Sequence, residues 1–252
     1  KRATHQEDED EIRERLELVA KEYAYKDVMD IPAKLTVSKL YPAVLDEGEE
    51  SRSLIQDDYD FELPDFMGDG ERRKKGARIG TSNHLFMQFC DLSLLRKNGV
   101  EAELQRLVEN GYVSKDIAAD VDKEKIKGFI KSTLASRIEN AKRVYKEQRF
   151  NIKLPAEDFT QDEEKRKALC GESIFVQGVI DLVFEEGEEI VLVDYKTDSF
   201  GREKTKEYVE NALRERYFLQ LEYYKKAVEK MFGKVPGEVL IYSFALSDTV
   251  KM

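Results

Sequence analysis

The chain has 252 residues, of which 41% are hydrophobic, and a formal net charge of -10. This length and hydrophobic content are enough for one large domain or two small ones with a buried core. No run approaches the roughly 18 apolar residues of a membrane span, and the first residues lack the apolar core of a signal peptide, so we expect a cytoplasmic protein with no membrane partner.

The negative charge is concentrated in the first part of the chain. Residues 1–70 carry 9 Lys and Arg against 20 Asp and Glu, whereas residues 71–252 carry 33 against 32. Nucleic-acid enzymes usually contact phosphates through Lys and Arg, so the balance beyond residue 70 neither supports nor excludes a DNA substrate. One basic cluster is a candidate phosphate contact, with a solvated turn as the alternative interpretation. It consists of Arg72, Arg73, Lys74, Lys75 and Arg78.

The first 70 residues are expected to form a separate part. Residues 7–29 have apolar residues at helical spacing and are followed by Pro32, which predicts an opening amphipathic helix. Residues 47–70 are acidic, contain glycine and proline and lack periodicity, which is typical of a linker or mobile loop. We therefore divide the chain into an N-terminal part at 1–70 and a main domain at 71–252. Because the chain starts with Lys1 rather than Met, we expect a fragment of a longer protein.

The main domain opens with a helix signal. Thr81 and Ser82 are good N-cap residues, and the apolar residues after them recur at helical spacing. We therefore expect a helix that begins near Thr81 and carries His84 in its first turn. Further helices are expected at 101–110, 114–119 and 122–140, and a first strand at 146–154.

The second half alternates strand and helix patterns. Residues 174–184 and 189–196 are rich in β-branched and aromatic residues and flank a short polar segment, which predicts a β-hairpin. Residues 203–232 are typical of one or two helices ended by Gly233, and residues 238–245 of a last strand. This alternation predicts an α/β fold with a mixed central sheet flanked by helices, and with an additional helical N-terminal part.

Two aspartates and a lysine interrupt the apolar strands of the hairpin. Because side chains alternate between the faces of a strand, Asp194 and Lys196 point to the same side. The turn brings Asp181 roughly opposite Asp194, since both lie at a similar distance from it along the chain. An ionised side chain in an apolar strand is costly unless it is paired or binds a cation. One interpretation is a structural salt-bridge cluster, and the other is a metal site beside a lysine.

The metal-site interpretation predicts a hydrolytic chemistry. Carboxylate oxygens are the ligands that Mg²⁺ prefers, and this ion keeps several waters. It makes water a usable nucleophile near neutral pH and neutralises charge on a phosphodiester. Lys196 would orient or help deprotonate that water and stabilise the developing charge. We therefore expect phosphodiester hydrolysis without a covalent intermediate.

Four short motifs follow one another along the chain. They are GTSNH (residues 80–84), GVID (178–181), VDYKTD (193–198) and QLEYY (220–224). Together they resemble the G-x-x-x-H, D, D-x-K and Q-x-x-x-Y motifs of the RecB family of restriction-endonuclease-like, PD-(D/E)xK nucleases. The resemblance covers about residues 79–230, and four motifs in the family's order are far more specific than any single one.

The resemblance implies a metal site and a catalytic lysine. His84, Asp181, Asp194 and the backbone carbonyl of Tyr195 match the family's metal ligands, and Lys196 matches its catalytic lysine. A satisfied core histidine is the alternative interpretation of His84. Mg²⁺ is the implied ion, with Mn²⁺ as a substitute.

The last motif implies support for the active site. Gln220 and Tyr224 are four residues apart and share a helix face. They are implied to contact the attacking water, the lysine or the scissile phosphate, and an ordinary amphipathic helix is the alternative. Glu147 is a weak match to an acid that the family often has before a strand, and we assign it no role.

Other cofactors are not expected. Cys90 and Cys170 are the two cysteines of the chain, too few for the iron–sulfur cluster of some relatives. The sequence lacks a G-x-x-x-x-G-K-[ST] loop, so we expect no ATP site in this chain.

Within the family, the strings around GTSNH and DYKTD are most similar to nuclease domains joined to bacterial helicases of the AddAB type. This similarity implies a DNA exonuclease that degrades single-stranded DNA unwound from double-strand ends during recombinational repair. Its implied partners are the helicase part of the same full-length chain and an AddB-type subunit. An inactive nuclease fold that binds a partner or guides a strand, and a free-standing nuclease of the same fold, are the alternatives.

Overall fold

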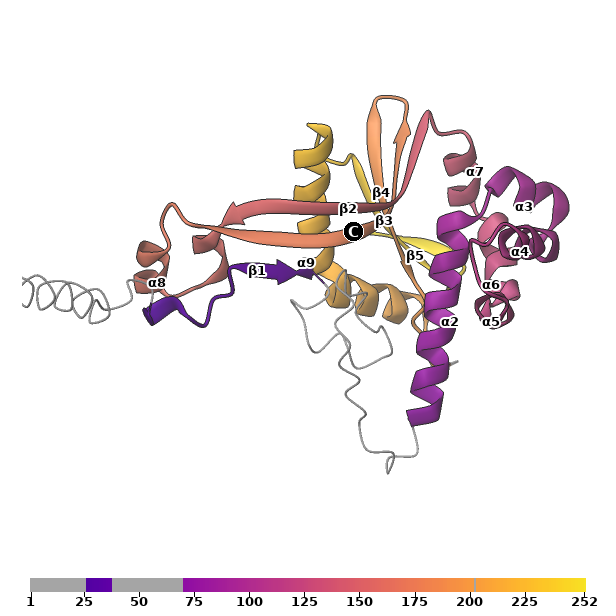
Figure 1. Ribbon diagram of the computed structural model, residues 1–252, viewed down its shortest axis with the longest axis horizontal. Helices are drawn as coiled ribbons and strands as arrows, with labels where there is room; N and C mark the ends of the chain where they lie inside the picture. The colour runs from indigo at the N-terminus through magenta and orange to yellow at the C-terminus, as the bar shows by residue number, and fades with distance from the viewer. Residues whose placement is uncertain (1–25, 38–69, 202) are drawn as a thin grey trace, which may run out of the picture. The chain divides into compact units, whose positions relative to one another are not determined.

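The computed structural model describes residues 26–37, 70–201 and 203–252 (Figure 1). The expected opening helix at 7–29 and the expected linker at 47–70 lie almost wholly outside these residues. Both therefore stay predictions, and so does the domain division at residue 70.

The chain divides into two compact units. The smaller comprises residues 1–35 and 153–175, and the larger comprises residues 36–152 and 176–252. Every side chain with an expected catalytic or metal-binding role lies in the larger unit. The described elements of the smaller unit are η1 (Lys26–Val28), most of β1 (Lys34–Thr36), η4 (Ala156–Phe159) and α8 (Glu163–Ala168), together with the end of β2 (Arg143–Pro155) and the start of β3 (Ser173–Glu186).

The short helix α8 was not predicted from the sequence. Its six residues are too few for a periodic apolar pattern. It is fixed by local contacts instead: Asp162 accepts hydrogen bonds from the backbone N–H groups of Glu164 and Lys165, and the Lys165 ammonium pairs with Asp30 at 2.6 Å.

The helices of the larger unit include several short ones that depend on their caps. The N-cap side chains of α3, α5, α6 and α7 each accept a hydrogen bond from a backbone N–H in the first turn, which satisfies a donor that the helix leaves unpaired. None of the helices in the described ranges is both long and apolar enough to cross a membrane. The elements are α2 (Gly70–Phe89), α3 (Leu92–Asn98), α4 (Val100–Glu109), α5 (Lys115–Asp120), α6 (Lys123–Ile130), α7 (Thr133–Glu139) and α9 (Lys206–Phe232).

Two of the expected helices differ from the sequence prediction by more than a shift of one to three residues. Helix α2 begins at Gly70 rather than near Thr81, so His84 lies in its C-terminal half and not in its first turn. The prediction was wrong because it took the good N-cap residues for a start, although the charged residues before them are good helix formers. The expected helix at 122–140 is two helices, because Ser132 caps a new start by accepting from the backbone N–H of Ala135.

The sheet is mixed, which confirms the expected fold class of a mixed α/β sheet flanked by helices. Among the described residues the strand order is β1-β3-β4-β5-β6, with β2 paired to β3. Strands β3 and β4 form the predicted antiparallel hairpin, and β5 runs parallel to β4 (Figure 1). The short β6, which was not predicted, pairs antiparallel with β5. The bounds are β2 (Arg143–Pro155), β3 (Ser173–Glu186), β4 (Glu189–Lys196), β5 (Glu238–Ser243) and β6 (Asp248–Lys251).

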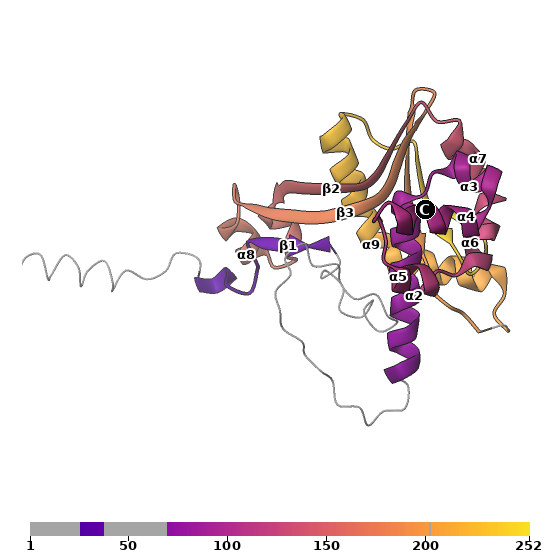
Figure 2. The same ribbon diagram turned by 45° about the vertical axis from the view of Figure 1, so that its right-hand side comes forward.

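The two faces of β4 serve different purposes. Val193 and Tyr195 belong to the main hydrophobic core with buried side chains of the helices α2, α3, α4, α6 and α7, and these helices lie close together in both ribbon views (Figure 2). Asp194 and Lys196 alternate with them and so point to the opposite face. On that face the Lys196 ammonium lies over the ring of Tyr217 in α9. The motif's acid and lysine are therefore enclosed between the sheet and α9.

Candidate active site

The β3–β4 hairpin sets the two predicted aspartates side by side. The antiparallel register pairs Leu182 with Val193, so Asp181 and Asp194 are the next residues along the two strands. Here the backbone N–H of Tyr195 donates a 2.8 Å hydrogen bond to Asp181 Oδ2. Asp181 is 8% exposed and Asp194 is 2% exposed. The hairpin argument for their proximity is thus supported, whereas a role of the Tyr195 carbonyl as a metal ligand stays a prediction.

Helix α2 brings His84 to the same place. Its Nδ1 lies 3.4 Å from Asp181 Oδ2, and the histidine is 9% exposed. The close approach of α2 requires a small residue one turn earlier, since a Cβ at Gly80 would lie 2.9 Å from Thr197 Oγ1. The spacing between Gly80 and His84 therefore has a steric reason. The carboxylate next to His84 is compatible with a metal site and also with a satisfied core histidine, so the role of His84 as a ligand stays a prediction.

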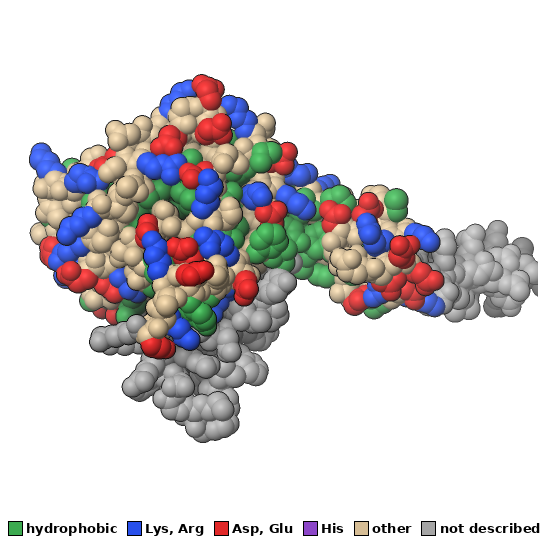
Figure 3. Space-filling model, turned by 180° about the vertical axis from the view of Figure 1, so that it is seen from behind, with side chains coloured by type: hydrophobic (Ala, Val, Ile, Leu, Met, Phe, Trp, Pro, Cys, Tyr) green, Lys and Arg blue, Asp and Glu red, His purple; other side chains and the backbone are tan. Residues whose placement is uncertain are grey.

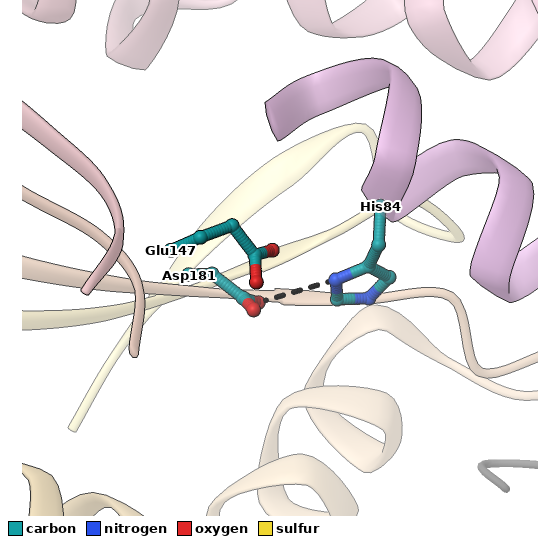
Figure 4. Close-up of side chains that lie close together, drawn as sticks. All are labelled: His84, Glu147 and Asp181. Carbon is teal, nitrogen blue, oxygen red and sulfur yellow. Dashed lines mark ion pairs between the residues drawn. The ribbon is translucent and has the colours of Figure 1, made fainter. Parts of the chain in front are cut away.

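Glu147, to which sequence reasoning assigned no role, joins this pair. One potential ligand atom from each of His84, Glu147 and Asp181 lies within 4.8 Å of the other two. Figure 4 shows the three side chains converging from α2, β2 and β3. Glu147 is therefore the functional candidate that the sequence analysis missed.

The backbone explains why Glu147 was missed. The buried residues of β2 alternate at Phe150, Ile152 and Leu154, and regular alternation would place residue 147 on the other face. Glu147 instead has a φ of 48°, a left-handed conformation that costs a residue with a Cβ about 1 kcal/mol. Such strain is often found at functional sites. The sequence of the expected strand at 146–154 contains no feature that predicts this change in backbone direction.

Asp194 and Lys196 form a buried ion pair beside this group. Lys196 Nζ lies 3.0 Å from Asp194 Oδ2, and both side chains are 2% exposed. The expected ligand set is therefore divided in the structure. Asp181 groups with His84 and Glu147, while the Asp194 carboxylate contacts the lysine. The salt bridge that one interpretation predicted is therefore present between Lys196 and Asp194. It is compatible with a metal site next to it.

Gln220 and Tyr224 lie on the face of α9 that covers the hairpin. Gln220 Nε2 donates a 3.0 Å hydrogen bond to the Tyr224 hydroxyl. Burial raises the pKa of Tyr224 well above its ordinary value, and the negative charges of Asp194 and Asp181 raise it further, whereas Lys196 lowers it. The hydroxyl therefore keeps its proton at neutral pH. The charges of Asp194 and Asp181 therefore reach Tyr224, while a role of Gln220 and Tyr224 in the active site stays a prediction.

The basic cluster at the start of α2 is described only in part. Arg78 pairs with Asp120, with 2.6 Å between Nη2 and Oδ2. The four residues before it lie in the helix, but their side chains are outside the described part of the chain, so a DNA contact there stays a prediction. They are Arg72, Arg73, Lys74 and Lys75.

The group of His84, Glu147 and Asp181 fits a divalent cation. Two carboxylates this close in a largely buried place repel each other unless positive charge compensates them. Hard ions such as Mg²⁺ and Mn²⁺ prefer carboxylate oxygens, and imidazole is a common additional ligand. The donor chemistry therefore matches an ion of this kind.

A mixed sheet whose central hairpin joins two buried aspartates to a lysine, under a histidine-bearing helix, defines a nuclease of the restriction-endonuclease-like class. Residues 58–250 match the family model of the PD-(D/E)XK nuclease superfamily, so the chain belongs to that superfamily, as the motifs predicted.

Within this superfamily, the chain is similar to curated proteins whose names join helicase to nuclease. An ATP-dependent helicase/nuclease subunit from Clostridium botulinum strain 657 is 31% identical over 247 residues, which cover 96% of this chain and 18% of the relative. The protein of the same name from Clostridium novyi strain NT is 33% identical over 244 residues, covering 93% and 18%. The chain therefore spans less than a fifth of the length of these relatives.

Proposed function

We propose that this chain is the Mg²⁺-dependent DNA exonuclease domain of a cytoplasmic helicase–nuclease of the AddA type, which processes double-strand DNA ends for recombinational repair. The observation that carries the proposal is the buried meeting of Asp181, Asp194 and Lys196 at the end of the hairpin, in a chain of a nuclease superfamily. The names of the relatives, which pair helicase with nuclease, support the larger context.

The acids and the histidine supply the binding site in this proposal. His84, Glu147 and Asp181 hold the cation, and Asp194 and the Tyr195 carbonyl are further ligands. When bound, a divalent cation neutralises charge on the scissile phosphate and makes water a better nucleophile near neutral pH. The buried carboxylates contribute a fixed negative field, because hydrogen bonds such as that from the Tyr195 N–H hold them in place.

The lysine and α9 act on the substrate and the water. Lys196 Nζ orients the attacking water and stabilises the negative charge that develops on the phosphate. Tyr224 keeps its proton at neutral pH because burial raises its pKa, so its hydroxyl can donate to the phosphate while Gln220 holds it in position. The reaction is a direct hydrolysis, in which water takes the place of the leaving oxygen.

A degradation assay tests the proposal. End-labelled single-stranded DNA should be degraded by the chain with Mg²⁺ and left intact with EDTA, and Asp194→Ala should abolish the activity. Asp116→Ala is the matched control, since it removes the same group from an exposed position in α5. Activity that persists in EDTA, or in Asp194→Ala, would contradict the assigned site. A folded but inactive wild-type chain would favour a module that binds a partner or guides a strand.

The weak basic character of the chain predicts how DNA reaches the site. Beyond residue 70 the charged residues nearly balance, and on the face in Figure 3 Lys and Arg are interspersed with Asp and Glu. We expect weak affinity for single-stranded DNA, with a salt dependence shallower than that of proteins making about 6–10 phosphate contacts. A helicase in the same chain would then supply the strand at high local concentration. Fluorescence anisotropy across a salt series measures this, and tight binding with a steep slope would contradict it.

A further inference from the structure

The surroundings of Lys196 extend beyond the four motifs. Its ammonium lies 4.0 Å from the centroid of the Tyr217 ring, in addition to its 3.0 Å contact with Asp194. Tyr217 is in α9, one turn before Gln220 and on the face that covers the hairpin, and it is 3% exposed. A cation over an aromatic face is attracted to the ring, and the attraction is stronger when both groups are buried.

Tyr217 is itself held from behind by a carboxylate. Its hydroxyl donates to Asp198, with both carboxylate oxygens at 2.9 Å. The Asp198 side chain is 5% exposed and pairs with Arg216, whose Nη1 lies 2.5 Å from Oδ1. Asp198 follows Lys196 by two residues. The end of β4 therefore contacts Tyr217 of α9 twice, through the Lys196 ammonium on its ring and through the Asp198 carboxylate on its hydroxyl.

We propose that Tyr217 is a positioning residue for Lys196, and that Asp198 and Arg216 fix its ring for that task. The inference deepens the proposed function, on which it rests, because it assigns a purpose to a side chain that touches the lysine and not the substrate. It also gives the last aspartate of DYKTD a role away from the metal site.

The chemistry of the contact suits a lysine that must act on water. An aromatic face attracts the ammonium without accepting one defined N–H bond, so it holds the nitrogen in place without fixing where each N–H donor points. The hydrogen bond from the Tyr217 hydroxyl to a charged carboxylate is a strong one, and it shifts electron density into the ring and makes its face more negative. The same bond stops the ring from turning away.

A spectroscopic test does not depend on activity. Protons held over an aromatic face are shielded, so the Lys196 ε-methylene signal of ¹³C-lysine-labelled protein should lie upfield of the signals of lysines that lie over no ring. The variant Lys196→Met assigns the signal and distinguishes it from those of Lys153, Lys204 and Lys226, which also lie over rings. Tyr217→Leu should move this signal downfield, and Tyr217→Phe, which keeps the ring, should leave most of the shift. An unchanged signal in Tyr217→Leu would overturn the inference, even if the chain proved to have no nuclease activity.

Kinetics supply the second arm. Tyr217→Leu should lower kcat by up to about 10²-fold, the loss expected when a catalytic group moves by about 1 Å, with KM and Mn²⁺ affinity near those of the wild type. Tyr217→Phe should recover most of kcat. Phe218→Leu is the matched control, because it makes a similar change at the next residue of α9, which is 60% exposed. An equal loss in Phe218→Leu, or a full kcat in Tyr217→Leu of an active enzyme, would contradict the role.

Discussion

Lys196→Ala should lower the rate of DNA hydrolysis by about 10²–10⁴-fold, the range expected when a group that acts on a reacting proton is removed, while Mn²⁺ affinity is retained. The ammonium lies 3.0 Å from Asp194 and is enclosed between the sheet and α9. Its removal takes a positive charge away from a buried carboxylate. A cation at the site should therefore bind no more weakly than before. Isothermal titration with Mn²⁺, beside a single-turnover nuclease assay, measures both quantities.

Controls separate this loss from unfolding. Breaking one partner of a buried ion pair destabilises proteins by about 3–5 kcal/mol, so Lys196→Met, which keeps most of the volume, should be measured together with the alanine variant. Lys123→Ala removes an exposed lysine from α6 and should change neither activity nor binding. If Mn²⁺ affinity fell in Lys196→Met as much as in Asp194→Ala, the lysine would be part of the binding site and not mainly catalytic.

The hairpin could be predicted from the sequence because its information is local. Period-two alternation fixes which residues share a face of β4, and the short turn fixes the register. The observed pairing of Leu182 with Val193 therefore followed from counting residues back from the turn, and so did the meeting of Asp181 with Asp194. His84 and Tyr224 came from motif resemblance, since nothing in their own neighbourhood shows that their helices would face this hairpin.

Other parts of the site depend on contacts between distant segments. Tyr217 has the spacing of an ordinary buried helix residue, and only the fold places its ring by Lys196. The early start of α2 shows the same limit, because a run of good helix formers and a run of good N-caps predict different boundaries. The need for a small residue at position 80 likewise comes from a distant part of the chain, because α2 packs closely against Thr197 just after β4.

Glu147 is the residue for which sequence and structure differ most. Sequence alternation places it away from the core, whereas its left-handed backbone turns the carboxylate toward His84 and Asp181. A strained backbone at this position lowers the stability of the fold. Replacing Glu147 with glycine should therefore weaken cation binding without lowering stability. If Glu147 had a purely structural role, the substitution would not weaken cation binding.

Glu147→Gly should weaken Mn²⁺ binding by at least about 10-fold, the lower end of the losses seen when residues around metal sites are changed, and lower nuclease activity accordingly. The same change should keep or raise the melting temperature, since glycine adopts a φ of 48° without strain. Ser247→Gly is the matched control: Ser247, with a φ of 51°, is the other non-glycine residue of positive φ in the described ranges, and it lies in the turn between β5 and β6. It should gain stability without loss of Mn²⁺ affinity. Calorimetric titration and thermal unfolding of both variants decide the matter, because unchanged Mn²⁺ affinity in Glu147→Gly would remove Glu147 from the site.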